Sequence, residues 1–371
     1  MTTTPEYAVQ LKGLSKHFGK VQAVKPIDLN IEQGSLVTLL GPSGCGKTTI
    51  LRMIAGLEHP TSGDIFIKGR RVNEVPIHRR NLGMIFQNYA LFPHKTIFDN
   101  VAFGLKYRSV PKDEIREKVR QALELVRLPD VEKRHPAQLS GGQQQRIALA
   151  RAIVIEPDVL LMDEPLSALD ENLREEMRRE IDNLQQMIGV TTIFVTHDQR
   201  EALSMSDKIV VMHDGVLQQE GPPEEVYNHP VNRTVADFLG TSTFFPATVL
   251  GREDGLYKVR LDDGTLFLVK NGRDWADQSR VELVIRAQKP NIVPAGDDEA
   301  MDQPNHFSGK IKDRSYMGGE VSYFVELKNG LELHVVTLGD QQPMKIGRKV
   351  DVHIPPDHCG LLPASSPSIG S

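Results

Sequence analysis

The chain has 371 residues, 39% of them hydrophobic and 25% charged, a composition that is typical of globular proteins and excludes the disordered and fibrous classes. This length predicts two or three domains with sizeable cores. The formal net charge is −5 and is evenly spread, with 15 basic and 18 acidic residues from Thr241 onward and 29 and 31 before it, so neither half is a basic nucleic-acid platform or a polybasic membrane arm.

Targeting and redox signals are few. No apolar stretch approaches the ~20 residues that a membrane-spanning helix needs, and the first residues lack the charged and apolar regions of a signal peptide. The two cysteines, Cys45 and Cys359, cannot make a disulfide framework, which favours a reducing compartment. The sequence therefore predicts a cytosolic protein, or one that reaches a membrane through a partner.

Buried strands are predicted at three places in the first 240 residues. Residues 35–40 form a short apolar run that ends at a glycine-rich turn, and a helix is expected to follow over residues 49–57. Such a run, bounded by turn signals, is typical of a buried strand in a largely parallel sheet. Residues 159–162 and 191–195 have the same character.

Two amphipathic helices are predicted in the same part of the chain. Apolar residues recur at helical spacing over residues 112–127 and again over residues 173–188. The charge-rich stretch 171–179 is interpreted as a solvated helix face, on which Glu175 and Arg179 form an i,i+4 pair.

The pattern changes after about residue 243. Short alternating strands appear, joined by turn signals at 263–264 and 329–330. These signals predict a small β-barrel domain over residues 241–363, with a polar loop at 295–305 and a loose tail at 364–371. Two hairpins are expected in this domain, with strands at 256–261 and 265–269 and at 321–327 and 331–338.

The turn after the first predicted strand fits the P-loop pattern of Gly, four residues and Gly-Lys-Ser/Thr. Glycines let backbone N–H groups converge on phosphate oxygens, and the following helix N-terminus adds a favourable dipole. Lys47 would reach the β- and γ-phosphates of ATP and Thr48 would reach Mg²⁺. We interpret Cys45 as a small loop residue rather than a redox switch. The candidate nucleotide-binding residues here are Gly41, Pro42, Ser43, Gly44, Cys45, Gly46, Lys47, Thr48 and Thr49.

Two adjacent carboxylates, Asp163 and Glu164, follow the apolar run 159–162. Ligands bind at the carboxyl ends of strands in open α/β sheets. We expect Asp163 to hold Mg²⁺ through water and Glu164 to polarise the attacking water. A strand that simply ends at a solvated turn is the alternative, which the P-loop makes less attractive.

A second anion-binding helix start is predicted about 100 residues beyond the P-loop. Ser140 is a good N-cap, and Gly141 and Gly142 let backbone donors face an anion, with Gln143 next in the chain. The alternative is a loop that merely caps a helix. One nucleotide within one chain does not need both helix starts.

With these motifs in place, the sequence resembles the ATP-binding cassette family. Leu139 to Gln143 reads as the signature pentapeptide of that family, and Gln87, the Ser-Ala-Leu-Asp run that ends at Asp170, and His197 follow the family's order and approximate spacing. The resemblance covers residues 7–240. It implies an α/β P-loop NTPase cassette over residues 1–240, with a mixed, mainly parallel sheet and a helical subdomain at about 88–155.

The resemblance also implies roles. Two copies of the chain would pair head to tail, so that the signature of one completes the ATP site of the other. Gln87 would touch Mg²⁺ and the docking surface, His197 would contact the γ-phosphate, and Asp170 would belong to the nucleotide site. Phe18 lies where relatives stack an aromatic ring on adenine, although an aromatic in an N-terminal strand is as often part of the core.

The β-domain resembles the OB-type regulatory domain of ATPase subunits of importers for sugars, polyamines, ferric iron and oxyanions. Relatives often have Pro-Glu after the arginine that corresponds to Arg286, whereas Ala-Gln follows here, which weakens a sensing role for Arg286. The domain would sense a ligand or only enlarge a dimer interface. A groove lined by Leu91, Phe92 and Phe103 is our candidate for docking the membrane subunits, with local core as the alternative.

The sequence thus favours the ATP-hydrolysing subunit of an importer at the cytoplasmic face of the inner membrane. Its expected partners are a second copy, two transmembrane permease subunits and, indirectly, a periplasmic or surface solute-binding protein, without nucleic acid. Soluble relatives in translation usually carry two cassettes, whereas this chain has one P-loop and one signature. Relatives in DNA repair have a long coiled coil between the P-loop and the signature, whereas only 52 residues separate Gln87 from Ser140 here. A regulatory module that sequesters a transcription factor would not explain the catalytic set. Polyamine importers are the closest resemblance, with ferric-iron, sulfate and sugar systems as alternatives.

Overall fold

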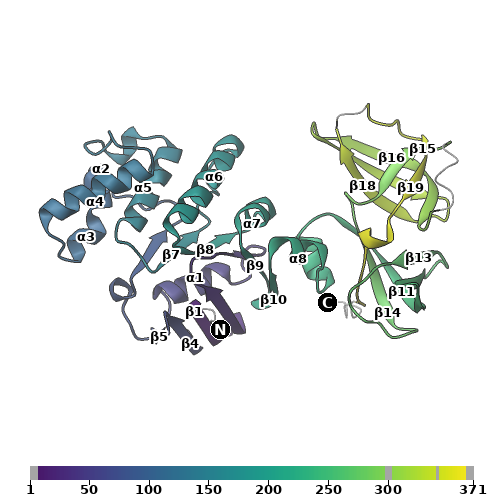
Figure 1. Cartoon of the computed structure of the whole chain (residues 1–371), viewed down its shortest axis with the longest axis horizontal. Coiled ribbons are helices and arrows are strands. Elements are labelled where there is room, and N and C mark those ends of the chain that lie inside the picture. The colour runs from purple at the N-terminus through teal and green to yellow at the C-terminus, as the bar shows by residue number, and fades with distance from the viewer. Residues whose placement is uncertain (1–6, 297–302, 340–341, 365–371) are drawn as a thin grey trace. The chain divides into compact units, whose positions relative to one another are not determined.

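The computed structural model describes residues 7–296, 303–339 and 342–364. The chain forms two compact units, Met1–Val226 and Tyr227–Ser371 (Figure 1). The domain boundary expected near residue 240 stays a prediction. The loose tail expected at 364–371 lies outside the described residues except for Ala364, as does the central part of the polar loop at 295–305.

A six-stranded sheet forms the centre of the first unit, in the order β10-β9-β3-β8-β7-β6. The five strands from β9 to β6 pair in parallel, and only β10 is antiparallel to its neighbour. Every residue of β3, β7 and β8 is buried, as expected for parallel strands covered on both faces. The three strands predicted from apolar runs are therefore confirmed. The strands are β3 (Leu36–Leu40), β6 (Leu82–Ile85), β7 (Val159–Asp163), β8 (Thr191–Thr196), β9 (Lys208–His213) and β10 (Val216–Gly221).

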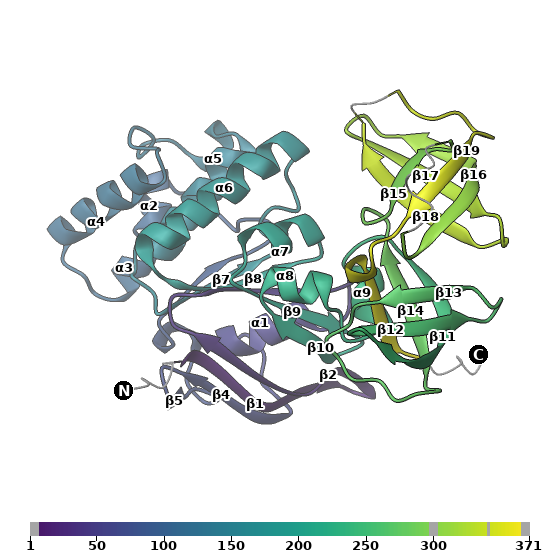
Figure 2. The same cartoon turned by 45° about the vertical axis from the view of Figure 1, so that its right-hand side comes forward.

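A smaller antiparallel sheet of the order β2-β1-β4-β5 lies beside the central sheet. Helix α1 (Lys47–Ala55) buries Ile50, Leu51 and Ile54 in a core that both sheets share. Figure 2 shows α1 on one side of β7 and β8 and the helices α6 and α7 on the other. The strands of the smaller sheet are β1 (Tyr7–Phe18), β2 (Val21–Glu32), β4 (Ser62–Ile67) and β5 (Arg70–Arg71).

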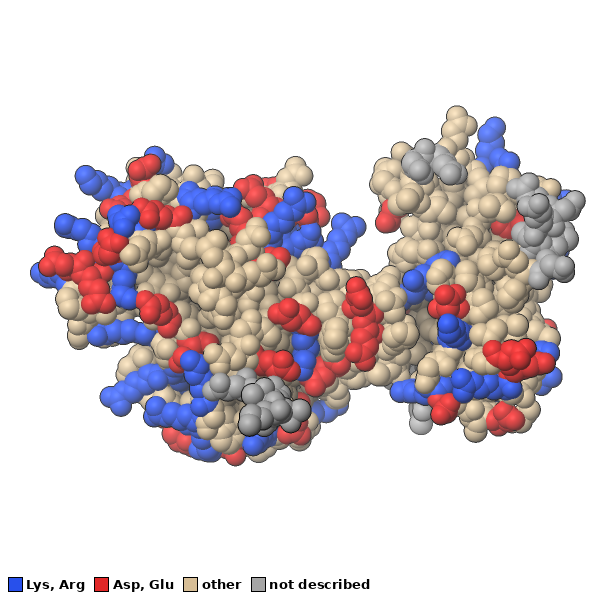
Figure 3. All heavy atoms as spheres, in the orientation of Figure 1, with Lys and Arg blue, Asp and Glu red and all other residues tan. Residues whose placement is uncertain are grey.

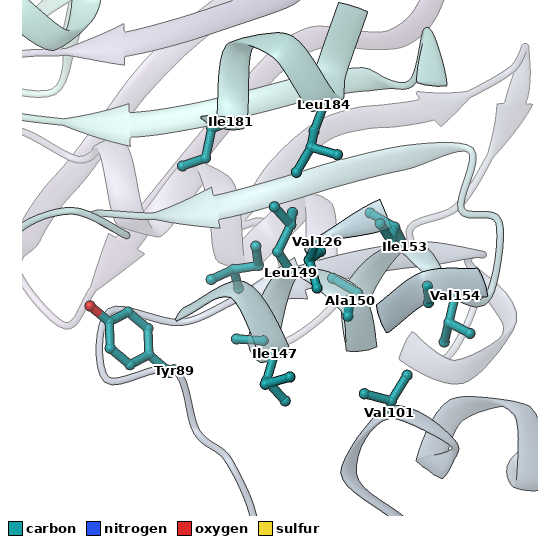
Figure 4. Close-up of a cluster of buried hydrophobic side chains, with 14 of the residues drawn as sticks. Tyr89, Val101, Val126, Ile147, Leu149, Ala150, Ile153, Val154, Ile181 and Leu184 are labelled. Atoms are coloured by element: carbon teal, nitrogen blue, oxygen red, sulfur yellow. The ribbon is translucent and has the colours of Figure 1, made fainter. Parts of the chain in front are cut away.

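Helices α2 to α5 form a helical part between β6 and β7, and α6 packs beside it. Their buried apolar side chains belong to one hydrophobic cluster, which includes Tyr89, Ile147, Leu149 and Ile181 (Figure 4). The predicted amphipathic helices are confirmed as α4 and α6. The helices are α2 (Ile97–Val101), α3 (Phe103–Tyr107), α4 (Lys112–Leu125), α5 (Gly141–Ile153), α6 (Glu171–Ile188) and α7 (Gln199–Met205).

The second unit contains two five-stranded antiparallel sheets, of the orders β13-β12-β11-β14-β20 and β15-β19-β16-β17-β18. Both sheets bury apolar residues in a single core. The predicted hairpins are confirmed as β12–β13 and β17–β18. The short helices α8 (Pro223–Asn228) and α9 (Arg233–Phe238) precede the sheets. The strands are β11 (Ser242–Glu253), β12 (Leu256–Leu261), β13 (Leu266–Val269), β14 (Arg280–Arg286), β15 (Asn291–Pro294), β16 (His306–Tyr316), β17 (Glu320–Leu327), β18 (Glu332–Leu338), β19 (Lys349–His353) and β20 (Cys359–Pro363).

Within the described ranges, none of the helices has both the length and the apolar composition needed to cross a membrane. Basic and acidic side chains are interspersed over the visible face of the first unit (Figure 3).

Candidate functional site

The P-loop connects β3 to α1, and its shape requires glycine at two positions. A Cβ atom on Gly41 would lie 2.2 Å from the carbonyl oxygen of Met212. Gly46 has a φ of +105°, and a Cβ atom there would lie 2.6 Å from the carbonyl oxygen of Ala23. Gly46 is also the N-cap of α1 and offers no side chain to cap the helix. The first N–H groups of α1 are therefore available to an anion.

Lys47 is buried beneath the loop. Its ammonium Nζ donates hydrogen bonds to the carbonyl oxygens of Gly41, at 2.6 Å, and Pro42, at 2.9 Å. A phosphate would be a stronger acceptor because it is charged. Cys45 is also buried, and burial raises the pKa of its thiol. The thiol is thus protonated at neutral pH, which favours a loop residue over a redox switch.

Thr48 and Asp163 join the P-loop to the end of β7. The Thr48 hydroxyl donates a hydrogen bond of 2.9 Å to Asp163 Oδ1. Asp163 is 7% exposed, and burial raises the pKa of its carboxyl. A hydroxyl and a carboxylate oxygen are ligands that suit Mg²⁺, which usually takes one or two protein oxygens together with substrate phosphates and water. The described part of the chain has no group of three or more His, Cys, Asp or Glu residues that could hold a metal ion. The Thr48 hydroxyl and the Asp163 carboxylate would fit a magnesium ion whose other ligands come from nucleotide and water.

Glu164 sits in a sharp turn immediately after β7. Its φ is +45°, which is uncommon for a residue other than glycine, and its N–H donates to the carbonyl oxygen of Val195 at 3.0 Å. This turn brings Glu164 Oε2 within 3.2 Å of His197 Nδ1. The Glu164 side chain is 20% exposed and that of His197 53% exposed. The Glu164 carboxylate thus follows β7, is held in place by a backbone hydrogen bond to β8, and remains accessible to solvent, so it can accept a proton from water.

Gln87 is linked to the same turn through one serine. Its amide Nε2 donates a 3.2 Å hydrogen bond to Ser167 Oγ, and Ser167 Oγ donates to the carbonyl oxygen of Glu164 at 2.9 Å. Asp170 is the N-cap of α6, where its carboxylate accepts the N–H of Leu173 at 3.1 Å. The structure therefore gathers Gln87 and Glu164 in one hydrogen-bonded chain.

The signature segment starts α5 with a capping box. Ser140 Oγ accepts the Gln143 N–H at 3.3 Å, and the Gln143 side chain accepts the Ser140 N–H at 3.1 Å. A Cβ atom on Gly142 would lie 2.9 Å from a methyl carbon of Leu173 on α6. Among the described residues, no hydrogen bond or ion pair joins residues 139–143 to the P-loop or to Asp163, Glu164 and His197. The second helix start is therefore not hydrogen-bonded to the first within the described part of the chain.

Phe18 ends β1 with its side chain exposed. The residue is 47% exposed, and Lys16 Nζ lies 4.8 Å from the ring centroid. The alternative in which this aromatic belongs to the core is wrong, because its ring faces solvent.

The expectation that residues 171–179 form one solvated face is only partly correct. Arg179 is 73% exposed and pairs with Glu175 at 3.1 Å, as expected. Arg174 and Arg178, however, have side chains that are only 28% and 20% exposed. The signal for this was present in the sequence, because Arg174 lies three residues before the buried Met177 and Arg178 three residues before the buried Ile181, a spacing that shares a helix face.

The segment after Gln87 is held by a half-buried arginine. Tyr89 and Ala90 have φ values of +57° and +45°, and Arg151 of α5 donates to both of their carbonyl oxygens, at 2.7 and 2.8 Å. The ring of Phe92 lies 4.7 Å from that of Phe103. Leu91 packs against the core of the helical part. The proposed docking groove is therefore a partly buried apolar surface with a fixed backbone.

Arg286 has a structural environment within the second unit. The guanidinium donates to the carbonyl oxygens of Tyr227, Ala236 and Gly240 and to the hydroxyl of Ser242. It therefore fixes the segment around α9 to β14.

Comparison with known proteins identifies relatives of both units. Residues 24–167 match the family model for ABC transporters, and residues 283–362 match the model for the TOBE domain. The chain is 47% identical over 328 residues to the spermidine/putrescine import ATP-binding protein PotA of Oleidesulfovibrio alaskensis, covering 88% of this chain and 87% of the relative. It is 47% identical over 332 residues to the Fe(3+) ions import ATP-binding protein FbpC of Rhizobium etli, covering 89% and 91%.

Solved structures of ABC transporter cassettes are similar to the first unit. The protein cbiO1 from Clostridium perfringens, part of the ABC transporter complex cbiONQ, is 31% identical with a TM-score of 0.56, over 60% of this chain and 90% of that one. The dimeric bacterial ABC transporter cassette MJ0796 is 33% identical with a TM-score of 0.52, over 58% and 98%.

Proposed function

Because this chain belongs to the ABC transporter family, as one of the ATP-binding proteins of its import systems, we propose that it is the ATP-hydrolysing motor of a binding-protein-dependent importer. One observation carries the chemistry. The Thr48–Asp163 hydrogen bond joins the P-loop to the end of β7, and Glu164 follows there beside His197.

The proposed reaction is attack of water on the γ-phosphorus of ATP. Glu164 accepts the proton as the water oxygen forms its bond to phosphorus, and the bond to the β-phosphate oxygen breaks, which releases ADP and phosphate. Lys47 and the N–H groups of the P-loop hold the phosphates, and His197 contacts the γ-phosphate. Mg²⁺ held by Thr48, Asp163 and Gln87 would supply positive charge next to the phosphate oxygens.

The signature helix start belongs, in this proposal, to the ATP site of a second copy. Gly141 and Gly142 offer N–H groups at the N-terminus of α5, and among the described residues no hydrogen bond connects this helix start to the P-loop of the same chain. The similarity to the dimeric cassette MJ0796 supports a head-to-tail pair. Binding of ATP would close this pair and hydrolysis would reopen it. Asp170 and Phe18 would complete the nucleotide site.

Two permease subunits would form the membrane part of the assembly, and a solute-binding protein would deliver the cargo from outside. The groove around Phe92 and Phe103 would receive the permeases, which places this chain at the cytoplasmic face of the inner membrane. The TOBE-matching domain would sense a ligand or enlarge the dimer interface.

The solute we propose is a polyamine. Relatives named as spermidine/putrescine import proteins match at 44–47% identity, and the ferric-iron import proteins at 46–47% supply the alternative. The test is import of radiolabelled spermidine and putrescine by cells that express the chain with its genomic neighbours, with Lys47→Ala as the control that cannot use ATP. Import of ferric iron, sulfate or a sugar instead of a polyamine would select the alternative. Loss of all ATP-dependent import would contradict the motor function.

A further inference from the structure

The first turn of α6 carries an arginine that contacts two separate parts of the candidate site. The Arg174 Nη2 donates a 3.1 Å hydrogen bond to the carbonyl oxygen of Leu169, the residue before Asp170. The same guanidinium lies 3.8 Å from Asp198 Oδ2 and 3.9 Å from Glu201 Oε1, at the start of α7. Arg174 thus spans from the loop that ends at Asp170 to the segment that follows His197.

That second segment is itself tightly fixed around His197. The Thr196 hydroxyl donates to Glu201 Oε2 at 2.5 Å and accepts the N–H of Asp198 at 3.0 Å. Asp198 then caps α7 by accepting the N–H groups of Arg200 and Glu201 at 2.7 and 3.3 Å. His197 lies between two residues of this network, so a displacement of Asp198 or Glu201 moves its backbone.

Arg174 Nη1 pairs with the exposed Glu171 at 2.9 Å, and the guanidinium also faces the carboxylates of Asp198 and Glu201 in a poorly solvated place. Glu201 is 5% exposed, and burial raises the pKa of its carboxyl, which the facing guanidinium of Arg174 opposes. The Arg174 Nε is buried and has no hydrogen-bond partner among the described residues, although Glu201 lies 3.9 Å away. Buried donors without an acceptor are rare. A shift of about 1 Å would convert this loose ion pair into a charge-assisted hydrogen bond.

We propose that Arg174 is a positioning residue that couples the loop ending at Asp170 to the segment carrying His197. It acts through Leu169, Asp198 and Glu201 and does not touch the nucleotide. This inference rests on the proposed function, in which Asp170 belongs to the nucleotide site and His197 contacts the γ-phosphate. Arg174 then holds the loop that ends at Asp170 and the segment that carries His197 in a fixed relation within one chain.

Arg174→Met tests the coupling, with Arg178→Met as the matched control. Arg178 lies one turn further along the same face of α6, has a side chain that is 20% exposed, and pairs with Glu175 at 2.6 Å. We expect Arg174→Met to lower kcat for ATP at least ~10-fold while KM changes less than ~2-fold, since the phosphate-binding residues are untouched. The control should retain near-normal kcat. Equal kcat values for the two variants, each normally folded by circular dichroism, would overturn the proposal.

Two further variants keep the test decisive. If Arg174 acts through Asp198, combining Arg174→Met with Asp198→Asn should cost no more kcat than the larger single loss, whereas losses that multiply would overturn the proposal. Arg174→Lys retains the charge but lacks the planar fork that reaches Leu169 and the carboxylates together, so we expect a low kcat even if the methionine variant does not fold. Full activity of the lysine variant would refute the coupling. Failure of the wild-type chain to hydrolyse ATP would instead contradict the proposed function.

Discussion

Replacing Glu164 with Gln tests the central chemical assignment. The substitution keeps the shape of the side chain and one oxygen, removes the negative charge, and leaves the backbone hydrogen bond from residue 164 to Val195 in place. The contacts of Lys47 and Thr48 belong to other elements and should persist. We therefore expect ATP affinity to be retained while turnover falls.

The expected loss follows from the geometry of the carboxylate. Glu164 is the charged acceptor that remains once Asp163 is committed to Thr48 and the metal, and general-base assistance contributes ~10²–10⁴-fold in rate. We expect at least a ~10²-fold loss, which corresponds to ~2.7 kcal/mol of transition-state stabilisation. Because hydrolysis reopens the pair, the variant should also accumulate a long-lived dimer.

Both outcomes can be measured in one experiment. The variant is mixed with Mg-ATP, phosphate release is followed, and molecular mass is determined by light scattering. Near-normal hydrolysis would move the base to another residue, with His197, 3.2 Å away, as the next candidate. A variant that neither hydrolyses nor dimerises would refute the head-to-tail mechanism.

Three other predictions follow from the same structure. Ser140→Arg should abolish ATPase activity but retain ATP binding, because it blocks the helix start offered to the second copy; a loss of ATP affinity as complete as in Lys47→Ala would argue for one site within one chain. Phe92→Asp should release the chain from its permeases, and unchanged co-purification of the folded variant would contradict the docking groove. Burial raises the pKa of Cys359 to about 12 and also raises the pKa of Cys45. At pH 8 the thiolate fraction of Cys359 is then about 10⁻⁴, so iodoacetamide should leave both cysteines unmodified, as measured by mass spectrometry, until urea unfolds the chain. Rapid alkylation of the folded protein would refute this prediction.

The elements that the sequence predicted are those whose burial is either uniform, as in three strands of the central sheet, or regularly periodic, as in α4 and α6. The strands β3, β7 and β8 are buried at every position, so they appear in the sequence as uninterrupted apolar runs. The smaller sheet was not predicted in this detail. Its first strand, β1, pairs with β2 through several register shifts, between Leu11 and Leu14 among others, and each shift breaks the two-residue alternation on which strand prediction depends.

The candidate site likewise has a part that the sequence predicted and a part that it did not. Motifs of fixed spacing located the P-loop, Asp163 and Glu164, because each motif lies within one turn of the chain and its chemistry depends on local backbone geometry. The link from Gln87 through Ser167 to Glu164 spans 80 residues in its first step, and no local pattern specifies such a contact.

Arg174 shows where a charge-based interpretation of a helix fails. A run of Glu and Arg predicts a solvated surface when each residue is judged by its own polarity, and Arg179 conforms to that expectation. Helical periodicity places Arg174 on the stripe of Met177 and Ile181, both of which are buried, so the geometry of the helix overrides its composition. A guanidinium that faces the interior needs acceptors, and Arg174 finds the Leu169 carbonyl oxygen at 3.1 Å and lies 3.8 and 3.9 Å from the carboxylates of Asp198 and Glu201, which follow His197. Charged residues on the buried stripe of an amphipathic helix are therefore the positions at which such a helix can be connected to a distant site.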